Sequence, residues 1–159
     1  MVIYTDGSAS PNPGKGGFGI VVYDNQNNLV KAYSHHEDNT TNNRQELKAI
    51  IFAALMYGEK QDPDSFFQTF PIVYSDSSYC INTLTSWMFS WERNGWRKSD
   101  KQIPENLDLI QEYYDWYQQG YRIDLRKVKG HAGTEGNEIA DQLAGGFITP
   151  EEVYKKYGN

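Results

Sequence analysis

The sequence is almost without cysteine, since Cys80 is the only one among 159 residues. One cysteine can form neither an internal disulfide nor a multi-cysteine zinc site, which excludes both as supports of the fold. A chain of this length does not need them, because it can bury roughly 68–70% of the surface that its unfolded state exposes. We therefore expect Cys80 to be a small packed hydrophobic residue.

Long apolar runs are lacking too. No stretch approaches the roughly 18 apolar residues that cross a bilayer. Residues 1–6 have neither the basic flank nor the apolar stretch of a signal peptide. The composition, 38% hydrophobic, 14% aromatic and 23% charged, is that of a globular protein. We expect a single domain over residues 1–159 that is cytoplasmic and monomeric and has no membrane partner.

Positive charge is also scarce. Fifteen Lys and Arg residues stand against 21 Asp and Glu residues, and the net charge of −6 repels nucleic acid overall. The distribution is uneven, because residues 87–103 have a local charge of +2 and residues 121–131 one of +3. An acidic protein can still bind a polyanion if two such basic segments lie on one side of it.

The pattern of hydrophobic and turn residues predicts a mixture of strands and helices. Strands are expected at 2–5, 17–23, 29–36, 71–75 and 121–128. Helices are expected over 42–58, from about 77, from Pro104, over 136–144 and over 149–157, with a surface loop at 59–70. The order βββαβα(α)βα predicts an α/β fold, in which a mixed five-stranded sheet has helices on both faces.

One glycine-rich segment formally fits the G-x-G-x-x-G pattern of dinucleotide-binding proteins. It runs from Gly14 to Gly19. The dinucleotide pattern needs a strand before it and a helix after it, whereas here a loop precedes and a strand follows. We interpret the segment as a tight bend with close backbone packing.

Four acidic residues lie at the ends of predicted elements. Asp6 and Asp76 end the first and fourth strands, Glu46 lies in the first turn of the first helix, and Asp141 lies in the helix after the fifth strand. If the first and fourth strands are neighbours, the two aspartates lie side by side at one edge of the sheet. Converging carboxylates without Lys or Arg partners require cations, and hard divalent ions such as Mg²⁺ or Mn²⁺ suit oxygen ligands.

Each acid taken alone also has a structural interpretation. Asp6 precedes a glycine and could be a turn residue. Glu46 could complete a capping box begun at Asn43. Asp76 with Ser77 could cap a helix, and Asp141 could be a solvated helix residue. The four acids together at these positions favour the metal site.

The acids lie within four longer segments. These are Tyr4-Thr5-Asp6-Gly7-Ser8 with Asn12-Pro13-Gly14 and Gly16-Gly17; Thr40-Thr41-Asn42-Asn43-Arg44-Gln45-Glu46-Leu47; Tyr74-Ser75-Asp76-Ser77; and Val128-Lys129-Gly130-His131-Ala132-Gly133, which continues to Ala140-Asp141. In this order they resemble the type 1 ribonuclease H family, in its cellular form with a basic handle. The resemblance covers nearly the whole chain.

The resemblance implies a metal-dependent endonuclease that hydrolyses the RNA strand of an RNA–DNA hybrid to 5′-phosphate and 3′-hydroxyl products. Asp6, Glu46, Asp76 and Asp141 match the family's catalytic, metal-binding acids, with Asp6 bridging two Mg²⁺ ions that Mn²⁺ can replace. Two ions about 3.5–4 Å apart can activate a water and stabilise the leaving oxygen. His131 matches the family's mobile catalytic histidine, which shuttles protons or helps the product leave.

The resemblance also implies contacts to the hybrid. Asn12 and Thr41 match a pocket for a DNA phosphate, Asn42 and Asn43 match minor-groove contacts, and Ser78 stands where some relatives carry a longer amide. We expect Tyr79 and Trp87 to line the DNA channel and Trp96 to be mostly buried. The handle, residues 87–103, also carries Trp91, Arg97 and Lys98. Because it is weakly basic, we expect modest, strongly salt-sensitive affinity.

Three other functions compete with this interpretation. The first is a hybrid-binding domain of the same fold without catalysis. The presence of all four acids and of the histidine argues against it. The second is a phosphoryl-accepting regulatory domain, but that class alternates strands and helices from the start. The third comprises integrases and resolvases, which share the acids but not the Thr-Asn-Asn and Trp-rich segments.

Overall fold

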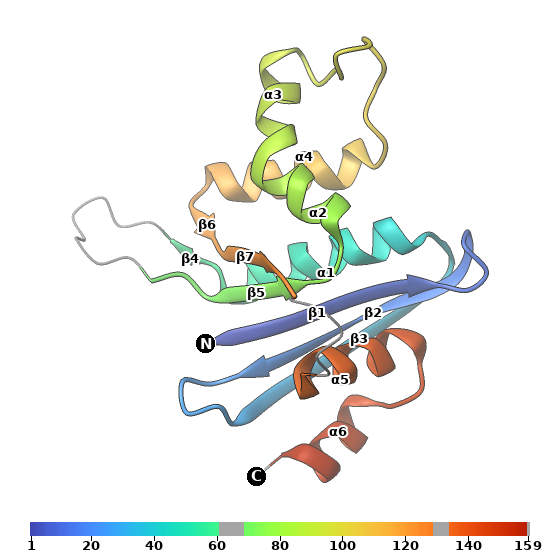
Figure 1. Ribbon diagram of the computed structural model, residues 1–159, viewed down its shortest axis with the longest axis vertical. Helices are drawn as coiled ribbons and strands as arrows, with labels where there is room; N and C mark the ends of the chain where they lie inside the picture. The colour runs from blue at the N-terminus through green and yellow to red at the C-terminus, as the bar shows by residue number, and fades with distance from the viewer. Residues whose placement is uncertain (61–68, 129–133, 159) are drawn as a thin grey trace.

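A mixed five-stranded sheet forms the centre of the protein, as the sequence predicted. The computed structural model describes residues 1–60, 69–128 and 134–158. The strands are β1 (Val2–Ala9), β2 (Gly14–Tyr23), β3 (Leu29–Thr40), β5 (Ile72–Ser75) and β7 (Asp124–Lys127), in the order β3-β2-β1-β5-β7 (Figure 1). β1, β2 and β3 pair antiparallel, whereas β1, β5 and β7 pair parallel.

Helices cover both faces of this sheet. Alternate residues of β2 point to opposite sides, so Ile20 and Val22 pack against α1 (Asn42–Tyr57), whereas Val21 and Tyr23 pack against α5 (Glu135–Gly145). Helix α4 (Leu107–Gln118) packs outside α1, and α6 (Pro150–Tyr157) lies against the edge strand β3. No helix in the described ranges is long and apolar enough to cross a membrane.

The expected fifth strand over 121–128 is two strands. Residues Tyr121–Arg122 form β6, which pairs with β4 (Glu59–Lys60) in a separate two-stranded sheet, and only β7 joins the main sheet. The chain changes its pairing partner at Ile123, whose side chain packs into the core. The expected loop at 59–70 is therefore wrong at its start, where β4 lies, and residues 61–68 are outside the described residues.

The segment from Gly14 to Gly19 is a strand, so the predicted tight bend is wrong. The turn lies just before it, at residues 10–13. The predicted close packing is confirmed: a Cβ atom on Gly16 would lie 2.3 Å from the Ser8 carbonyl oxygen, and one on Gly19 would lie 2.4 Å from that of Ala140. These glycines allow neighbouring backbones to approach β2 from the strand and from the helix side.

Helix α1 begins with a cap that the sequence analysis did not predict. Thr41 is the N-cap, and its Oγ1 accepts a hydrogen bond of 3.2 Å from the backbone N–H of Arg44. The capping box begun at Asn43 is therefore wrong, and Glu46 lies beyond the first turn. Gly58 ends the helix, as predicted.

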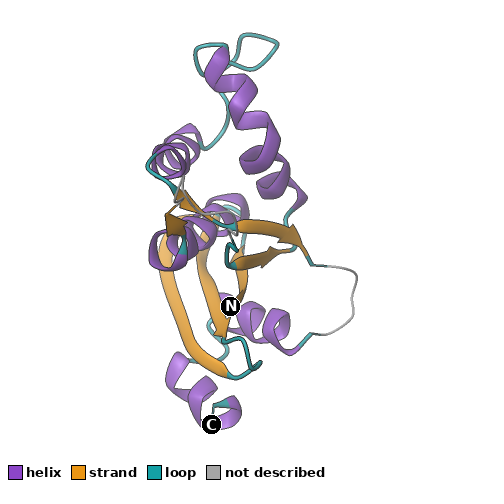
Figure 2. Cartoon of the chain, turned by 90° about the vertical axis from the view of Figure 1, so that its left-hand side faces the viewer, coloured by secondary structure: helices purple, strands orange, loops and turns teal. Residues whose placement is uncertain are grey.

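The segment after β5 is one helical rod with a π-helical turn inside it (Figure 2). It comprises α2 (Ser78–Asn82), the π-helix η1 (Thr83–Trp87) and α3 (Met88–Arg93). Ser77 caps it, in line with the cap considered for Asp76 and Ser77. Pro104 does not lie in the next helix, because α4 begins only at Leu107, after Asn106 has taken a left-handed backbone conformation with φ of 60°. Buried Cys80 packs in the core, as expected.

Candidate active site

The pairing of β1 with β5 brings two aspartates to the same level of the sheet. The parallel register joins Val2 to Ile72 and Tyr4 to Tyr74, so Asp6 is level with Asp76. Asp76 follows the end of β5, as predicted. Asp6 does not end its strand, because β1 continues to Ala9 in pairing with β2. It lies instead where β1 extends beyond β5, which leaves that side of the strand open.

Glu46 reaches the same place from α1 because the helix lies directly on β1. A Cβ atom on Gly7 would be only 2.3 Å from the backbone nitrogen of Glu46, so glycine permits this close approach. The Gly7 backbone hydrogen-bonds to the Glu46 carboxyl. Buried Ser75 donates a further hydrogen bond, of 3.3 Å, from Oγ to Oε2 of Glu46. These contacts fix the carboxyl beside the end of β5.

The carboxyl groups of four acids meet at this point. Oxygen atoms of Asp6, Glu46 and Asp76 all lie within 4.8 Å of one another. Asp141 joins from α5 through a side-chain hydrogen bond with Asp6. Asp6 and Glu46 are 6% and 7% exposed, whereas Asp76 and Asp141 are exposed to solvent. The four acids expected to act together are therefore brought together, with two at the base and two at the rim.

The two buried acids hold their protons unusually tightly. Burial, with the nearby carboxyls of Asp141 and Asp76, raises the pKa of Asp6 to about 7. Burial and the neighbouring Asp6 raise the pKa of Glu46 well above its usual range. Within the described ranges, no ion pair with Lys or Arg involves any of the four acids. An oxygen-only ligand set with unpaired negative charge fits a hard divalent cation.

A group of polar residues lies beside the acids, where the turn at residues 10–13 meets the start of α1. We call it the polar turn; it comprises Asn12, Thr41, Asn42 and Asn43. The backbone N–H of Asn42 donates to Oδ1 of Asn12 at 3.1 Å, and Asn42 Oδ1 accepts from the backbone of Ala9 at 2.6 Å. These bonds tie the turn at residues 10–13 to the helix start. Asn12 and Asn42 are exposed, while Thr41 and Asn43 are half-buried. The structure therefore gathers all four into one surface, although Thr41 and Asn42 also have structural bonds.

Comparison with known proteins places the chain in a family. The family model described as RNase H matches residues 1–148. The chain belongs to the ribonuclease H family. It is 39% identical over 159 residues to the protein named ribonuclease H of Jannaschia sp. (strain CCS1), and the match covers 98% of this chain and 96% of that one. The resemblance to the ribonuclease H family and the predicted fold class are thus confirmed.

Solved ribonuclease H structures have the same fold. The solution structure of the PFV RNase H domain matches with a TM-score of 0.73 at 26% identity, covering 91% of this chain and 92% of that one. LC11-RNase H1, solved in complex with an RNA/DNA hybrid, matches with a TM-score of 0.63 at 22% identity, covering 96% and 97% of the two chains. The latter similarity concerns the fold alone.

The handle expected of a cellular ribonuclease H carries one exposed tryptophan, Trp87. Trp87 is 44% exposed, and its ring centroid lies 6.2 Å from that of half-buried Trp91. Trp96 packs against the core, in line with the expectation that it is mostly buried, with its ring edge-to-face on Tyr114 at 5.2 Å. Arg97 is exposed and Lys98 half-buried. These positions leave Trp87 accessible to a ligand.

Two further predicted contacts lie at the base of the handle. Ser78 is exposed, and its Oγ accepts a hydrogen bond from Lys127 Nζ of β7. Half-buried Tyr79 accepts from the Asn106 amide at 3.1 Å and donates to the Glu105 carbonyl at 3.4 Å. His131, the expected catalytic histidine of this ribonuclease H, lies outside the described residues.

Some residues of the site were missed by sequence reasoning. Ser75 was part of a predicted strand, and nothing local indicated that its hydroxyl would support Glu46. Gly7 was interpreted within a turn signal, whereas it allows a helix to pack on a strand. Lys127 was only one charge in a basic segment. The sequence Asp6-Gly7-Ser8 within β1 was the one available signal, because a glycine beside an acid often marks a close backbone approach.

Proposed function

We propose that this chain is a metal-dependent endonuclease that hydrolyses the RNA strand of RNA–DNA hybrids and leaves 5′-phosphate and 3′-hydroxyl ends. The observation that carries the proposal is the meeting of four carboxyl groups, from β1, α1, the end of β5 and α5. Membership of the ribonuclease H family supports the same reaction.

The four acids would hold the metal. We assign Asp6, Glu46, Asp76 and Asp141 to two Mg²⁺ ions, with Mn²⁺ as a substitute, and Asp6 is the proposed bridge because the other three carboxyls surround it. When bound, such ions supply Lewis acidity that activates a water, orients the scissile phosphate and stabilises the leaving 3′ oxygen. The raised pKa values of Asp6 and Glu46 support this assignment, since each carboxylate lacks a compensating charge.

The chain's own groups prepare the site for that reaction. Ser75 and the Gly7 backbone hold the Glu46 carboxyl in place. Asp76 and Asp141 stand at the solvent-exposed rim, where a phosphate can approach. We assign His131 to shuttling protons or helping the product leave. The base of the site is thus buried and hydrogen-bonded, and its rim is exposed to solvent.

The hybrid would lie across the polar turn and the handle. We assign Asn12 and Thr41 to a DNA phosphate and Asn42 and Asn43 to the minor groove, where RNA displays its 2′-hydroxyls. The handle side comprises Ser78, Tyr79, Trp87, Trp91, Arg97 and Lys98. The exposure of Asn12, Asn42 and Trp87 supports these assignments.

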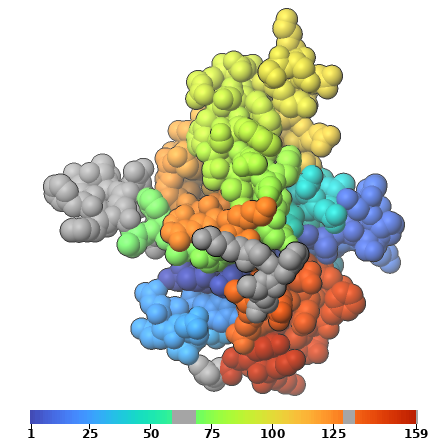
Figure 3. Space-filling model, in the orientation of Figure 1, coloured from blue at the N-terminus to red at the C-terminus, as the bar shows by residue number. Residues whose placement is uncertain are grey.

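The basic segments also favour a hybrid partner. On the face seen in Figure 3, β7 lies directly against the helical segment that leads into the handle, and Lys127 there contacts Ser78. The described part of the basic segment, residues 121–128, therefore reaches the base of the basic handle. This arrangement offsets the net charge of −6 locally.

The decisive experiment incubates the purified chain with labelled RNA–DNA hybrid, double-stranded RNA and double-stranded DNA, each with Mg²⁺ and with EDTA. We expect cleavage of the RNA strand of the hybrid alone, and only with Mg²⁺. Asp76→Asn is the matched variant, because it removes one ligand at the exposed rim. Binding of the hybrid without any cleavage by the unaltered chain would instead identify a non-catalytic binding domain.

We further propose that the chain acts as a monomer of one domain in the cytoplasm. All four acids come from a single chain, so the site needs no second copy. The single thiol, Cys80, is fully buried, and burial raises its pKa to about 12, which makes it unreactive toward oxidants. Size-exclusion chromatography with light scattering should give a mass near 18.3 kDa.

A further inference from the structure

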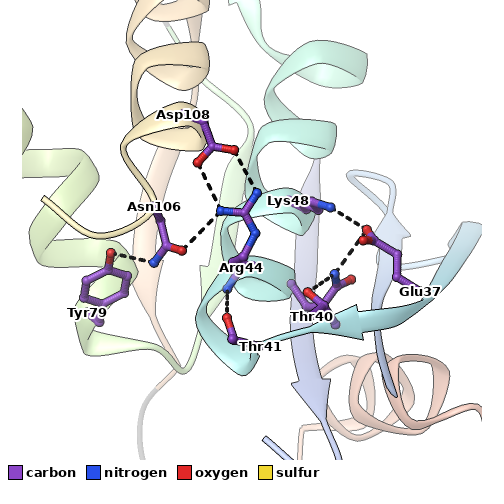
Figure 4. Close-up of polar contacts among 9 residues, drawn as sticks. Glu37, Thr40, Thr41, Arg44, Lys48, Tyr79, Asn106 and Asp108 are labelled. Carbon is purple, nitrogen blue, oxygen red and sulfur yellow. Dashed lines mark hydrogen bonds and ion pairs between the residues drawn. The ribbon is translucent and has the colours of Figure 1, made fainter. Parts of the chain in front are cut away.

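A polar bridge joins the start of α1 to the start of α4. The guanidinium of Arg44 donates to both carboxylate oxygens of Asp108, from Nη1 at 3.0 Å and from Nη2 at 2.8 Å (Figure 4). Nη1 also reaches Oδ1 of Asn106 at 3.4 Å. This two-pronged geometry fixes direction as well as distance between two helices that are far apart in the sequence.

Asn106 marks the point where the chain returns from the handle to the body. It is the N-cap of α4, yet its side chain makes no capping bond. An asparagine at this position usually caps its own helix. Here its amide lies between Arg44 and Tyr79, accepting from the first and donating to the hydroxyl of the second at 3.1 Å. The residue therefore gives up a local bond to make a long-range connection.

The bridge links the two groups of proposed hybrid contacts. Arg44 stands on the same turn of α1 as Thr41, whose hydroxyl accepts from the Arg44 backbone N–H. At the other end, Tyr79 lies on α2, which continues through η1 into the handle. Figure 4 shows Arg44 directed away from Thr41 toward Asp108 and Asn106, with Tyr79 beyond. The polar turn and the base of the handle are thus held at a fixed separation.

We propose that Arg44 is a positioning residue for hybrid binding: with Asp108 and Asn106 it holds the handle at the distance from the polar turn that one duplex requires. This inference rests on the proposed function. It does not require Arg44 to touch the nucleic acid. The Asp108 side chain is 65% exposed and that of Arg44 31%, so the ion pair adds little to global stability. Its effect lies in the placement of two binding surfaces.

The direction in which one substitution changes hybrid affinity separates this proposal from a simple effect of net charge. Asp108→Asn removes a negative charge from an acidic protein, which by charge alone should strengthen binding of a polyanion. If the bridge positions the handle, the same change weakens binding instead. We expect KM for the hybrid to rise about fivefold while kcat at saturating hybrid stays unchanged. Arg44→Lys, which keeps the charge but loses the two-pronged bond, should raise KM similarly.

Two controls complete the test. Asp115→Asn makes the same charge change at an exposed position of the same helix. Asp115 takes part in no ion pair within the described ranges, so its substitution should leave KM unchanged or lower. Asp108→Glu keeps the carboxylate and should restore most of the affinity. The melting temperature of Asp108→Asn should be lower than that of the unaltered chain by less than about 3 °C.

Other outcomes would overturn the inference. These are an unchanged or lower KM in both Asp108→Asn and Arg44→Lys, a loss in kcat alone, or unfolding that accounts for the loss. Failure of the proposed function looks different, because the unaltered chain would then bind the hybrid without cutting it or would not bind it at all. In the first of those cases, dissociation constants for the same variants replace KM.

Discussion

At the scale of single residues, Asp6 illustrates how a functional group can oppose folding. Its pKa rises from 3.8 in the unfolded chain to about 7 in the metal-free folded protein. Between these values the folded state binds a proton that the unfolded state lacks, so stability is highest at low pH in this window and falls as pH rises through about 7. Binding of the proposed cation would remove this penalty.

Asp6→Asn should therefore separate stability from activity. In EDTA at pH 8 we expect the variant to be more stable than the unaltered chain, on the order of 2 kcal/mol, and to lose less stability between pH 5.5 and pH 8. Hybrid cleavage should disappear because the proposed bridging ligand is gone. Thermal unfolding at the two pH values, together with a cleavage assay, checks both effects. Retained cleavage would exclude Asp6 from the reaction.

Gly7 gives the second prediction at this scale. A Cβ atom there would meet the backbone of α1 at 2.3 Å, so Gly7→Ala must push α1 away from β1. We expect a loss of about 2–4 kcal/mol in the free energy of unfolding, measured in urea, and a lower kcat because Glu46 moves. Gly95→Ala is the control: a Cβ atom there meets nothing within 4 Å, and the left-handed backbone costs roughly 1–2 kcal/mol without affecting Glu46.

At the scale of elements, α6 protects the exposed edge of the sheet. The hydroxyl of Tyr154 accepts from the backbone N–H of Ala32 at 3.0 Å and donates to its carbonyl at 3.2 Å. Ala32 lies on β3, an edge strand whose free backbone groups would otherwise be available to another chain. Tyr154→Phe should lower the free energy of unfolding by about 1–2 kcal/mol and increase aggregation, with cleavage per folded molecule unchanged. Urea unfolding and light scattering measure the two effects, and an unaltered urea midpoint would contradict this role of α6.

The elements themselves were largely predictable, whereas their ends were not. The spacing of apolar residues predicted α1, and the predicted helix over 149–157 is α6, which Thr149 and Glu152 cap. Both signals are local. The split at Ile123 and the strand that starts at Gly14 depend on which distant backbone lies alongside. The residues near each strand in the sequence do not indicate which distant strand it pairs with.

The candidate site divides in the same way. Acidic side chains at element ends predicted the cluster, because the physics of converging carboxylates is general. The groups that hold the acids, such as Ser75 beside Glu46, could not be predicted, since they lie 29 residues apart in the chain. The bridge from Arg44 to Asp108 spans 64 residues and left no local signal either.

At the scale of the whole molecule, metal binding and folding should be coupled. Because the acids gather only in the native state, a divalent cation binds that state preferentially and stabilises it. We expect 10 mM Mg²⁺ to raise the melting temperature at pH 8 by about 3–8 °C, and the increase should vanish in Asp6→Asn. Ca²⁺ should stabilise without supporting cleavage if geometry at the phosphate matters. No shift with either ion would contradict a metal site at these acids.

The overall charge distribution predicts a steep response to salt. The molecule carries −6 as a whole, and in the proposed function the hybrid binds to the basic handle and the basic segment that follows it in the chain. Increasing salt from about 50 to about 200 mM should therefore raise KM for the hybrid several-fold, because counterions compete for the phosphates. Asp108→Asn should not alter the slope of log KM against log salt concentration. Lys98→Ala should reduce that slope by about one, which corresponds to the loss of one phosphate contact. A KM that does not change with salt would exclude an electrostatic role of the handle.

The three register pairs between Val2–Tyr4 and Ile72–Tyr74 have a consequence for how such a chain can evolve. They set the level of Asp76 relative to Asp6, so the connection between β4 and β5 can vary in length without changing that level. Insertions or deletions in that connection would leave both aspartates in step. The sequence of this peripheral connection can therefore change independently of the active-site geometry. Relatives can acquire new peripheral segments while the two aspartates stay at the same level.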